Sequence, residues 1–237
     1  MPSDWPAGPI TYYGIMCGRF SAAFDYSSLA EQYQAQRAPN LPKSSWNIAP
    51  GATVAIIAQD RNDIRHLNPA RWGLIPSWSV SDHLDYPTHN ARVETALTKR
   101  TYADAARCQR AIIPASGYYE WTKDHRPFYF HSPDESPLAI AGLYSWWRED
   151  EHSPWLLTAT ILTTQAEGEA ALVHERMPLL ITEANADEWL DPDLDGSDVF
   201  PRAMDLGRKS SAGLVQHQVA PLKGDGPQLT DDISLRL

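Results

Sequence analysis

Cys17 is the residue with the most distinctive chemical potential in this sequence, because it follows Met16 and precedes Gly18. Met followed by a small residue is the context in which an initiator methionine is removed. A protein that started at Met16 would therefore begin, after processing, with Cys17. An N-terminal cysteine carries a thiol and an α-amine on adjacent carbons, and this pair can condense with an aldehyde and close to a five-membered thiazolidine ring. An internal cysteine lacks the amine and cannot do so.

The residues before this pair, 1–15, decide whether the amine is free. They contain three Pro, no Lys or Arg and no continuous apolar segment. They therefore match neither a secretory signal nor a basic presequence. We interpret 1–15 as an N-terminal extension that is either non-native or removed. We expect one domain over residues 16–225 and a C-terminal tail over 226–237.

Composition and charge exclude several classes of protein. The 237 residues are 43% hydrophobic and 21% charged, which is ordinary for a folded domain. No apolar run approaches the roughly 20 residues that a membrane span needs, so we expect no membrane partner. The net charge of −10 argues against a general polyanion binder, since phosphate contacts dominate affinity for nucleic acids. Any DNA binding must come from a local basic groove.

The cysteine count restricts cofactors and compartment. The chain has two cysteines, Cys17 and Cys108, too few for a disulfide scaffold or a cysteine-based metal site. A reducing cytoplasm is the expected location, and Cys108 is interpreted as structural. The histidines show no paired metal-ligand spacing. We predict no metal and no cofactor, and expect a monomer.

Hydrophobic patterning predicts a β-rich chain with short helices. Strands are expected at Thr53–Ala58, Ala70–Ile75, Arg110–Pro114, Gly117–Trp121, Phe128–His131, Leu138–Trp146, Leu156–Thr164, Leu179–Thr182 and Leu214–Ala220. Helices are expected near Tyr26–Gln36, Tyr102–Arg107, Gly168–Val173 and Asn185–Leu190, and polar loops at Pro133–Pro137 and Asp191–Asp198. The pattern does not alternate strand and helix. We therefore predict an α+β fold: a single domain with a curled or barrel-like mixed sheet and short inserted helices.

Eight motifs in a fixed order carry a resemblance to a known family. They are MCGRF (16–20), WNIAPG (46–51), RWGLIPSW (71–78), NARVET (90–95), IPASGYYEW (113–121), AGLYSWW (141–147), TILTTQA (160–166) and HERMPLLI (174–181). Together they resemble the SOS-response-associated peptidase (SRAP) family of abasic-site-processing proteins. The resemblance runs from Met16 to about Ala220, which is nearly the whole chain.

This resemblance implies a sensor of abasic sites in single-stranded DNA that crosslinks itself to the lesion through its N-terminal cysteine and shields it during the DNA damage response. Cys17 is similar to the family's nucleophile, Asn90 to its positioning amide, Glu120 to its acid/base carboxylate and His174 to its active-site histidine. Further residues fall where DNA contacts are implied or lie in the same motifs: Arg19 and Arg92 on phosphates, and Arg71, Trp72 and Arg176.

The chemistry fits these residue types. An abasic sugar opens to an aldehyde, and an α-amine with a pKa near about 8 is partly neutral at cytoplasmic pH, so it can form an imine that the thiol then closes. Proton transfers in these steps suit a carboxyl and an imidazole, each worth roughly 10²–10⁴-fold. Glu120 follows two Tyr and precedes Trp121, an apolar context of the kind that raises a carboxyl pKa. Cys17 could also release Met16 by autoproteolysis, and the imine makes a lyase reaction chemically possible.

Two other classes of function stay open from the residues alone. Cys17 with His174 could act as a cysteine peptidase on other proteins, and the basic and aromatic residues could form a noncatalytic module that binds single-stranded DNA. Turnover of peptides without DNA favours the first class. Binding that is unchanged by Cys17→Ala, with no covalent species, favours the second.

Overall fold

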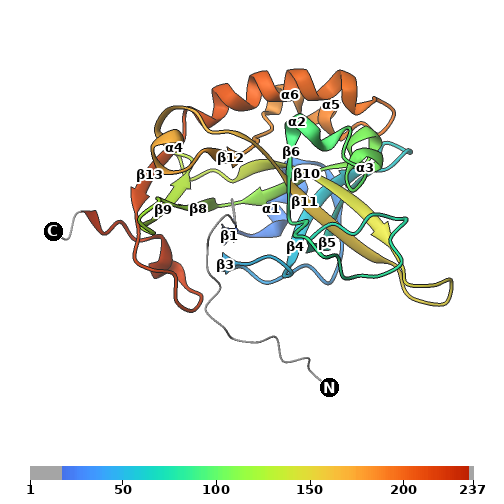
Figure 1. The fold of residues 1–237 in the computed structure, drawn as a ribbon, viewed down its shortest axis with the longest axis horizontal. Coiled ribbons are helices and arrows are strands. Elements are labelled where there is room, and N and C mark those ends of the chain that lie inside the picture. Colours follow the sequence, from blue (N-terminus) through green and yellow to red (C-terminus); the bar gives the residue numbers. More distant parts are fainter. Residues whose placement is uncertain (1–17, 235–237) are drawn as a thin grey trace.

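Five strands close into a barrel in the computed structural model, which describes residues 18–234 (Figure 1). In ring order they are β11 (Leu156–Gln165), β10 (Leu138–Trp147), β7 (Arg110–Ala115), β4 (Thr53–Gln59) and β5 (Arg65–Trp72). Four of the pairings are antiparallel. The ring closes through a parallel pairing in which Arg71 and Trp72 lie opposite Thr158 and Ala159. The barrel is therefore mixed.

Barrel strands are buried on both faces, which explains their continuous apolar sequences. On β4, Val54 and Ile56 belong to one hydrophobic cluster while Ala55 and Ile57 belong to another, as the two-residue period of a strand requires. The first of these clusters joins the barrel to a second sheet, and the other joins it to the helices. The barrel is thus the centre on which both other layers pack.

The second sheet contains β1, the first strand of the described chain, which pairs with a neighbour on each side. Its strand order is β13 (Val215–Gln218), β9 (Pro127–His131), β8 (Gly117–Trp121), β1 (Arg19–Ala22) and β3 (Ser45–Ile48). Phe20 on β1 and Tyr118 on β8 face each other across the ladder and enter the cluster shared with the barrel. This contact fixes β1 against the barrel wall.

Three short strands extend the barrel sheet. They are β2 (Ala35–Arg37) beside β5, and β6 (Asn90–Arg92) and β12 (Arg176–Pro178), both beside β11. The β6 strand runs parallel to Ile161–Thr163, and β12 runs antiparallel to Thr163–Gln165. The C-terminal half of β11 therefore brings β6 and β12 into one region.

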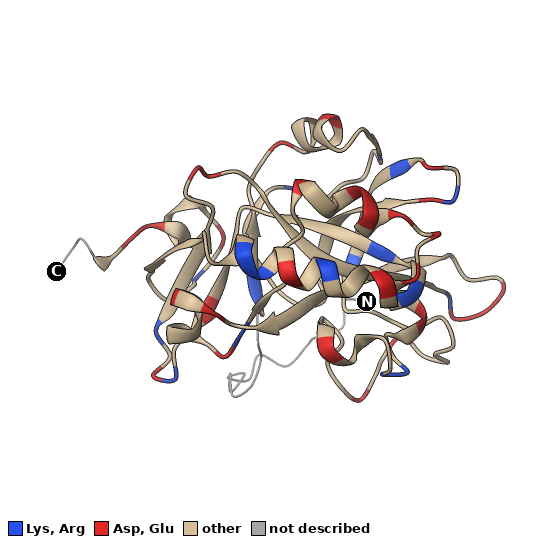
Figure 2. Cartoon of the chain, turned by 90° about the horizontal axis from the view of Figure 1, so that it is seen from above, with Lys and Arg blue, Asp and Glu red and all other residues tan. Residues whose placement is uncertain are grey.

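The helices α2, α5 and α6 lie at the top of Figure 1, whereas α1 lies lower, at the level of the strands. The helices are α1 (Tyr26–Gln32), α2 (Val93–Ala96), α3 (Ala103–Cys108), α4 (Gly168–Val173), α5 (Ala186–Leu190) and α6 (Gly196–Ser211), with 3-10 turns at Glu183–Asn185 and Pro227–Thr230. Figure 2 looks onto this layer and shows basic and acidic residues interspersed along α6. Arg202, Arg208 and Lys209 each pair with a carboxylate. This face therefore offers no broad positive surface.

The predicted fold class is confirmed, and the main differences concern individual elements. The segment Leu179–Thr182 forms only an isolated bridge, Ile140 to Leu180, instead of a strand. The helix expected to reach Gln36 ends at Gln32, because Gln34 has a φ of 51° and β2 follows. The predicted strand Ala70–Ile75 is shifted, since β5 ends at Trp72 and Gly73 has a φ of 144°.

The longest helix, α6, was not predicted, and residues from Gly196 onward belong to it and not to the expected loop Asp191–Asp198. Its sequence contains Pro201 and Gly207, which lower helix propensity. Packing outweighs this preference. A Cβ at Gly207 would lie 2.5 Å from the carbonyl oxygen of Leu180, so the absent side chain is what lets the helix approach the barrel.

Candidate active site

The ladder between β1 and β8 positions Glu120. Arg19 lies opposite Tyr119 and Phe20 opposite Tyr118, so continuing the register by one residue places Gly18 opposite Glu120. Glu120 is 2% exposed and lies on the same face of β8 as Tyr118, because strand side chains alternate. The carboxyl-bearing residue is thereby buried next to the first described residue. Cys17 and Met16 lie outside the described residues.

Arg19 is held by the part of the WNIAPG motif that lies in β3. Its Nη1 donates a hydrogen bond of 2.7 Å to Oδ1 of Asn47, and Nδ2 of Asn47 donates one of 2.7 Å to the carbonyl of Gly224. The neighbouring Trp46 amide donates to the carboxylate of Asp225 at 2.7 Å. The C-terminal segment thus orients an arginine at the start of β1.

Asn90 opens β6, where it lies opposite Ile161 of β11. Its carbonyl accepts a hydrogen bond of 3.1 Å from the Tyr102 hydroxyl, and it is half-buried. Two residues on, Arg92 is exposed and lies opposite Thr163. Strand periodicity therefore puts the side chains of Asn90 and Arg92 on one face. Among residues 18–234, Arg92 forms no ion pair.

His174 follows α4 and is half-buried. Its Nδ1 lies 3.0 Å from the backbone N–H of Arg176, which donates to it. An imidazole nitrogen that accepts a hydrogen bond carries no proton. Nδ1 also lies 3.3 Å from the carbonyl oxygen of Arg176, to which it would donate in the other tautomer. The backbone of Arg176 engages Nδ1 in either case, so Nε2 is the nitrogen that remains for proton exchange.

The side chain of Arg176 is already engaged. Its Nη1 and Nη2 donate to the two carboxylate oxygens of Glu94 at 2.7 and 2.8 Å, and Nη2 also donates to the carbonyl of Thr163 at 2.6 Å. Its side chain is 11% exposed. These hydrogen bonds lower the pKa of Glu94. A phosphate would have to compete with Glu94 for this guanidinium.

Trp72 is 1% exposed, so its ring faces are covered and offer no surface to an unstacked base. Its Nε1 donates to the carbonyl of His89 at 2.8 Å, and its ring makes edge contacts with Phe20 and His89, at centroid distances of 5.0 and 5.7 Å. Trp72 therefore connects β1 to the segment that carries Asn90. The neighbouring Arg71 is partly exposed and pairs with Asp82 at 3.3 Å.

One buried cluster lies beneath these elements. It contains chain neighbours of the predicted site residues: Phe20 beside Arg19, Trp72 beside Arg71, Val173 beside His174 and Met177 beside Arg176. Glu120 is two residues from Tyr118 of the same cluster. Residues far apart in sequence are thus supported by one core, which limits their relative motion.

Two residues of this region, Asn47 and His89, were not among the site residues predicted from the sequence. Asn47 belongs to a motif that was recognised, but its bond to Arg19 joins residues 28 positions apart and is visible only in the fold. His89 is 8% exposed, and burial lowers its pKa to about 4, so it is neutral at pH 7. The only feature of the sequence that could have drawn attention to His89 is its position directly before Asn90.

Residues 18–234 contain no group of three or more His, Cys, Asp or Glu side chains that could hold a metal ion. None of their helices is both long and apolar enough to cross a bilayer.

Known proteins resemble this chain over most of its length. Abasic site processing protein YoqW of Bacillus subtilis is 35% identical over 185 residues, which cover 75% of this chain and 81% of that protein. Abasic site processing protein YedK of Escherichia coli is 32% identical over 231 residues, covering 92% and 100%.

Solved structures agree with the fold. The crystal structure of a Bacteroides thetaiotaomicron protein has a TM-score of 0.75 at 20% identity, covering 91% of this chain and 99% of that one. The sequence model for the SOS response associated peptidase (SRAP) matches residues 16–221. With its eight motifs arranged on this barrel, the chain belongs to the SRAP family.

Proposed function

We propose that this protein is a sensor of abasic sites in single-stranded DNA, acting as a monomer, and that it forms a covalent thiazolidine crosslink through Cys17. Two relatives named as abasic site processing proteins support the lesion as substrate. The crosslink would shield the lesion during the DNA damage response. The domain responsible would extend over residues 16–225.

The observation that carries this proposal is the register of β1 against β8, which puts Gly18 opposite the buried Glu120. Cys17 is joined to Gly18 by a peptide bond, and consecutive Cα atoms are about 3.8 Å apart. An α-amine on Cys17 would therefore be close to the Glu120 carboxyl. This is the arrangement that acid/base assistance of imine formation needs.

The proposed reaction has two covalent steps. The Cys17 amine attacks the aldehyde carbon C1′ of the opened sugar, and the oxygen leaves as water after protonation by Glu120, which gives the imine. The Cys17 thiolate then attacks the same carbon, and the imine nitrogen takes up a proton, which closes the thiazolidine. His174 Nε2 exchanges protons with the sugar or the thiol, since its Nδ1 is occupied by the Arg176 amide.

The remaining residues bind the strand in this proposal. Asn90 hydrogen-bonds the amine or the sugar without adding charge, while Arg19 and Arg92 contact phosphates. Arg71 and Arg176 are further candidates, each of which would exchange a carboxylate for a phosphate. Trp72 contributes as a buried support instead of a stacking surface.

Two side activities follow from the same groups. The Cys17 thiol could attack the carbonyl of Met16, so that the Cys17 nitrogen leaves as the amine and a thioester forms. Water would then hydrolyse the thioester and release residues 1–16 as a carboxylic acid, which would be an autopeptidase reaction. The imine intermediate could undergo β-elimination, a lyase reaction, if ring closure were slower.

The test is a mixture of the protein starting at Met16 with single-stranded DNA that carries one abasic site. We expect an adduct that survives heating and migrates slowly on a denaturing gel, and we expect none with Cys17→Ala. The full Met1 chain should give none unless residues 1–16 are removed, because the nitrogen of Cys17 is then an amide. A processed protein that forms no adduct would refute the proposal.

A further inference from the structure

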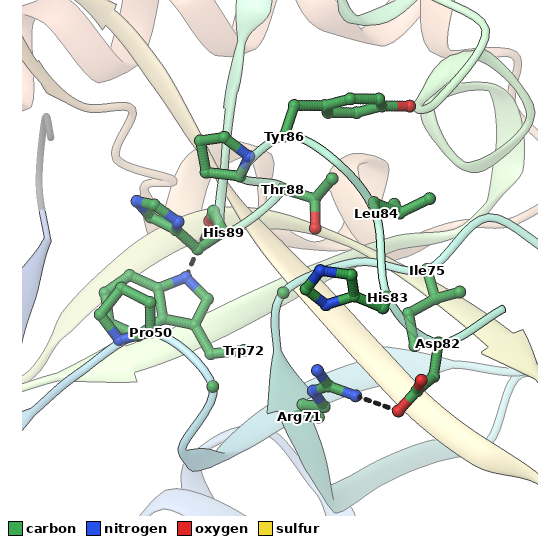
Figure 3. A pocket seen from close by; sticks show the side chains of 13 residues that line it. Pro50, Arg71, Trp72, Ile75, Asp82, His83, Leu84, Tyr86, Thr88 and His89 are labelled. Carbon is green, nitrogen blue, oxygen red and sulfur yellow. Dashed lines mark hydrogen bonds and ion pairs between the residues drawn. The ribbon is translucent and has the colours of Figure 1, made fainter. Parts of the chain in front are cut away.

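Two histidines of the second sheet form a pair that none of the assignments above uses. His131 ends β9, and His217 lies on the neighbouring strand β13. Their ring centroids are 5.4 Å apart, with the ring planes at 70°. They are distinct from His83 and His89, which line the cavity at the end of β5 (Figure 3). Imidazole is the commonest metal ligand in proteins, so two imidazoles in contact deserve comparison with a metal site.

The ladder between β9 and β13 puts both rings on one face of the sheet. His217 lies opposite Tyr129, which precedes His131 by two residues, and side chains two residues apart on a strand share a face. The Tyr129 ring packs against both, with centroids 5.4 Å from His131 and 5.9 Å from His217. Its hydroxyl hydrogen-bonds the Ser21 hydroxyl of β1 at 2.9 Å. The pair is therefore supported by a tyrosine that is itself anchored.

Each ring has one nitrogen bonded to a backbone carbonyl. Nδ1 of His131 donates to the carbonyl oxygen of Ser132, and Nε2 of His217 donates to that of Thr230, both at 2.8 Å. Since a carbonyl only accepts, these two nitrogens carry the protons. In the neutral rings the lone pairs are then on Nε2 of His131 and Nδ1 of His217. Among residues 18–234, neither of these nitrogens forms a hydrogen bond.

Metal-binding histidines have the same outer contacts. A ligating imidazole almost always donates its other N–H to a carboxylate, a carbonyl or water, which fixes the tautomer and the ring orientation. Here both carbonyls belong to turns with internal hydrogen bonds. The Ser132 hydroxyl donates to Asp134 at 2.6 Å, and the Thr230 hydroxyl donates to the carbonyl of Pro227 at 2.9 Å. The tautomers needed for metal binding are therefore set by the fold.

The separation of the rings also fits a shared ion. Zinc–imidazole bonds are about 2.0–2.1 Å long, so two imidazoles on one tetrahedral ion have centroids roughly 5 Å apart. Small side-chain rotations bring the observed 5.4 Å to this value. Imidazole suits zinc, nickel and copper, whereas magnesium and calcium prefer oxygen ligands. Both histidines are half-buried, so an ion can reach them from solvent.

We propose that His131 and His217 bind one divalent transition-metal ion, through Nε2 and Nδ1 respectively, and that the ion ties β13 to β9. No group of three His, Cys, Asp or Glu side chains exists among residues 18–234, so water completes the coordination. The spacing of the histidines predicted no metal because the two ligands are on strands far apart in the sequence.

The position of the site gives the ion a structural role. The strand β13 is the last of its sheet, and it leads into the segment whose Gly224 carbonyl fixes the Asn47 amide. A ligand that binds only the native state stabilises it. The ion would therefore hold the edge strand and the C-terminal segment in place.

The test measures metal binding by the full chain carrying Cys17→Ala and no affinity tag, since a thiol or a tag would bind the same ions. Zn²⁺ or Ni²⁺ should bind in calorimetric titrations and raise the unfolding temperature. In His131→Asn the amide nitrogen can replace Nδ1 as donor to Ser132, and in His217→Gln it can replace Nε2 as donor to Thr230. Each variant lacks one metal-binding lone pair, so we expect at least about tenfold weaker binding.

The matched control is His152→Gln, whose ring is 88% exposed and lies outside the pair, and which should bind as its parent does. No binding by the parent, or equal affinity in the parent, His131→Asn and His217→Gln, would overturn the proposal and leave adventitious binding only. If a variant does not fold, ¹⁵N spectra of the parent decide. Zn²⁺ should shift Nε2 of His131 and Nδ1 of His217 together, and a shift of neither contradicts the site. No DNA is present, so these results do not depend on the proposed crosslinking.

Discussion

The guanidinium of Arg19 and the amide of Asn47 are joined by a hydrogen bond of 2.7 Å across the β1–β3 edge of the second sheet. The same amide is fixed on its other side by the carbonyl of Gly224. An amide held at both ends has little rotational freedom, so the arginine is presented in one orientation. The C-terminal segment therefore acts on the start of β1 through one side chain.

Asn47→Ala should weaken DNA binding by loosening Arg19. One hydrogen bond contributes about 1 kcal/mol, so we expect affinity for single-stranded DNA to fall about fivefold. Fluorescence anisotropy with a labelled oligonucleotide measures it. In a double-mutant cycle with Arg19→Ala the two effects should be strongly non-additive. Additive effects would mean that Asn47 does not act through Arg19.

Glu120→Gln should slow crosslinking with little change in affinity. The substitution preserves shape but removes the proton that the carboxyl can give or take, and we expect the rate to fall about 100-fold. Single-turnover time courses on denaturing gels measure it. Glu149→Gln, on an exposed hairpin, is the control and should react normally. A normal rate in Glu120→Gln would exclude it as the acid/base group.

His174→Asn distinguishes the roles of the two ring nitrogens of His174. The Asn side-chain oxygen can replace Nδ1 as acceptor for the Arg176 amide while nothing replaces Nε2. We expect normal folding and DNA affinity, with crosslinking slowed about 100-fold. A variant with lost affinity and an unchanged rate at saturating DNA would indicate that His174 binds the strand instead.

The strands were predictable where one local pattern decides them. Gly117–Trp121 was predicted with its observed bounds, and Thr53–Ala58 ends one residue before β4 does, because continuous burial dictates an apolar run. The α6 helix was not predictable in this way, since Gly207 is unfavourable in a helix and is explained only by the Leu180 backbone against which it packs.

In the candidate site, too, some features follow from local sequence and others only from the fold. Cys17, Glu120 and His174 are predicted site residues that come from motifs within single segments. By contrast, the Asn47 amide depends on Gly224, 177 residues away, and the pairing of Arg176 with Glu94 spans 82 residues. Contacts over such separations are set by the tertiary arrangement of the strands and the C-terminal segment, and not by any local sequence.

Glu94→Gln should release Arg176. With 39% of the Glu94 side chain exposed, we expect a loss of only about 1 kcal/mol in unfolding free energy. The freed guanidinium can then bind a phosphate, so affinity for single-stranded DNA should rise and its salt dependence should steepen by about 0.7 in log–log slope. Glu169→Gln in α4 is the control. Unchanged affinity and slope would show that Arg176 does not reach the strand.

The ion pair between Arg176 and Glu94 also predicts that the free energy of unfolding falls at acidic pH. Arg176 lowers the pKa of Glu94 below its ordinary value of 4.5. The stabilisation is therefore present above pH 4.5 and is lost as pH falls through the lowered pKa. Glu94→Gln should remove this part of the acid sensitivity in urea unfolding followed below pH 4.5.

His89 should make stability depend on pH over a different range, between pH 4 and 6.5. Its pKa falls from 6.5 to about 4 on burial, so between these values the unfolded chain binds a proton that the native protein does not. Stability must then decrease as pH is lowered from 6.5 to 4, by up to about 3 kcal/mol. The carboxylates of Asp134 and Asp195, with pKa values of about 2, titrate below this window.

His89→Phe tests this assignment, because it retains a ring against Trp72 but cannot take up a proton. We expect its unfolding free energy to vary less between pH 4 and 6.5 than that of the wild type, when both are measured by urea titration at fixed ionic strength. His152→Gln, whose ring is 88% exposed, should retain the wild-type slope. An equal slope in His89→Phe would place the titrating group elsewhere, because the only term removed is the buried imidazole at the wall between β5 and β6.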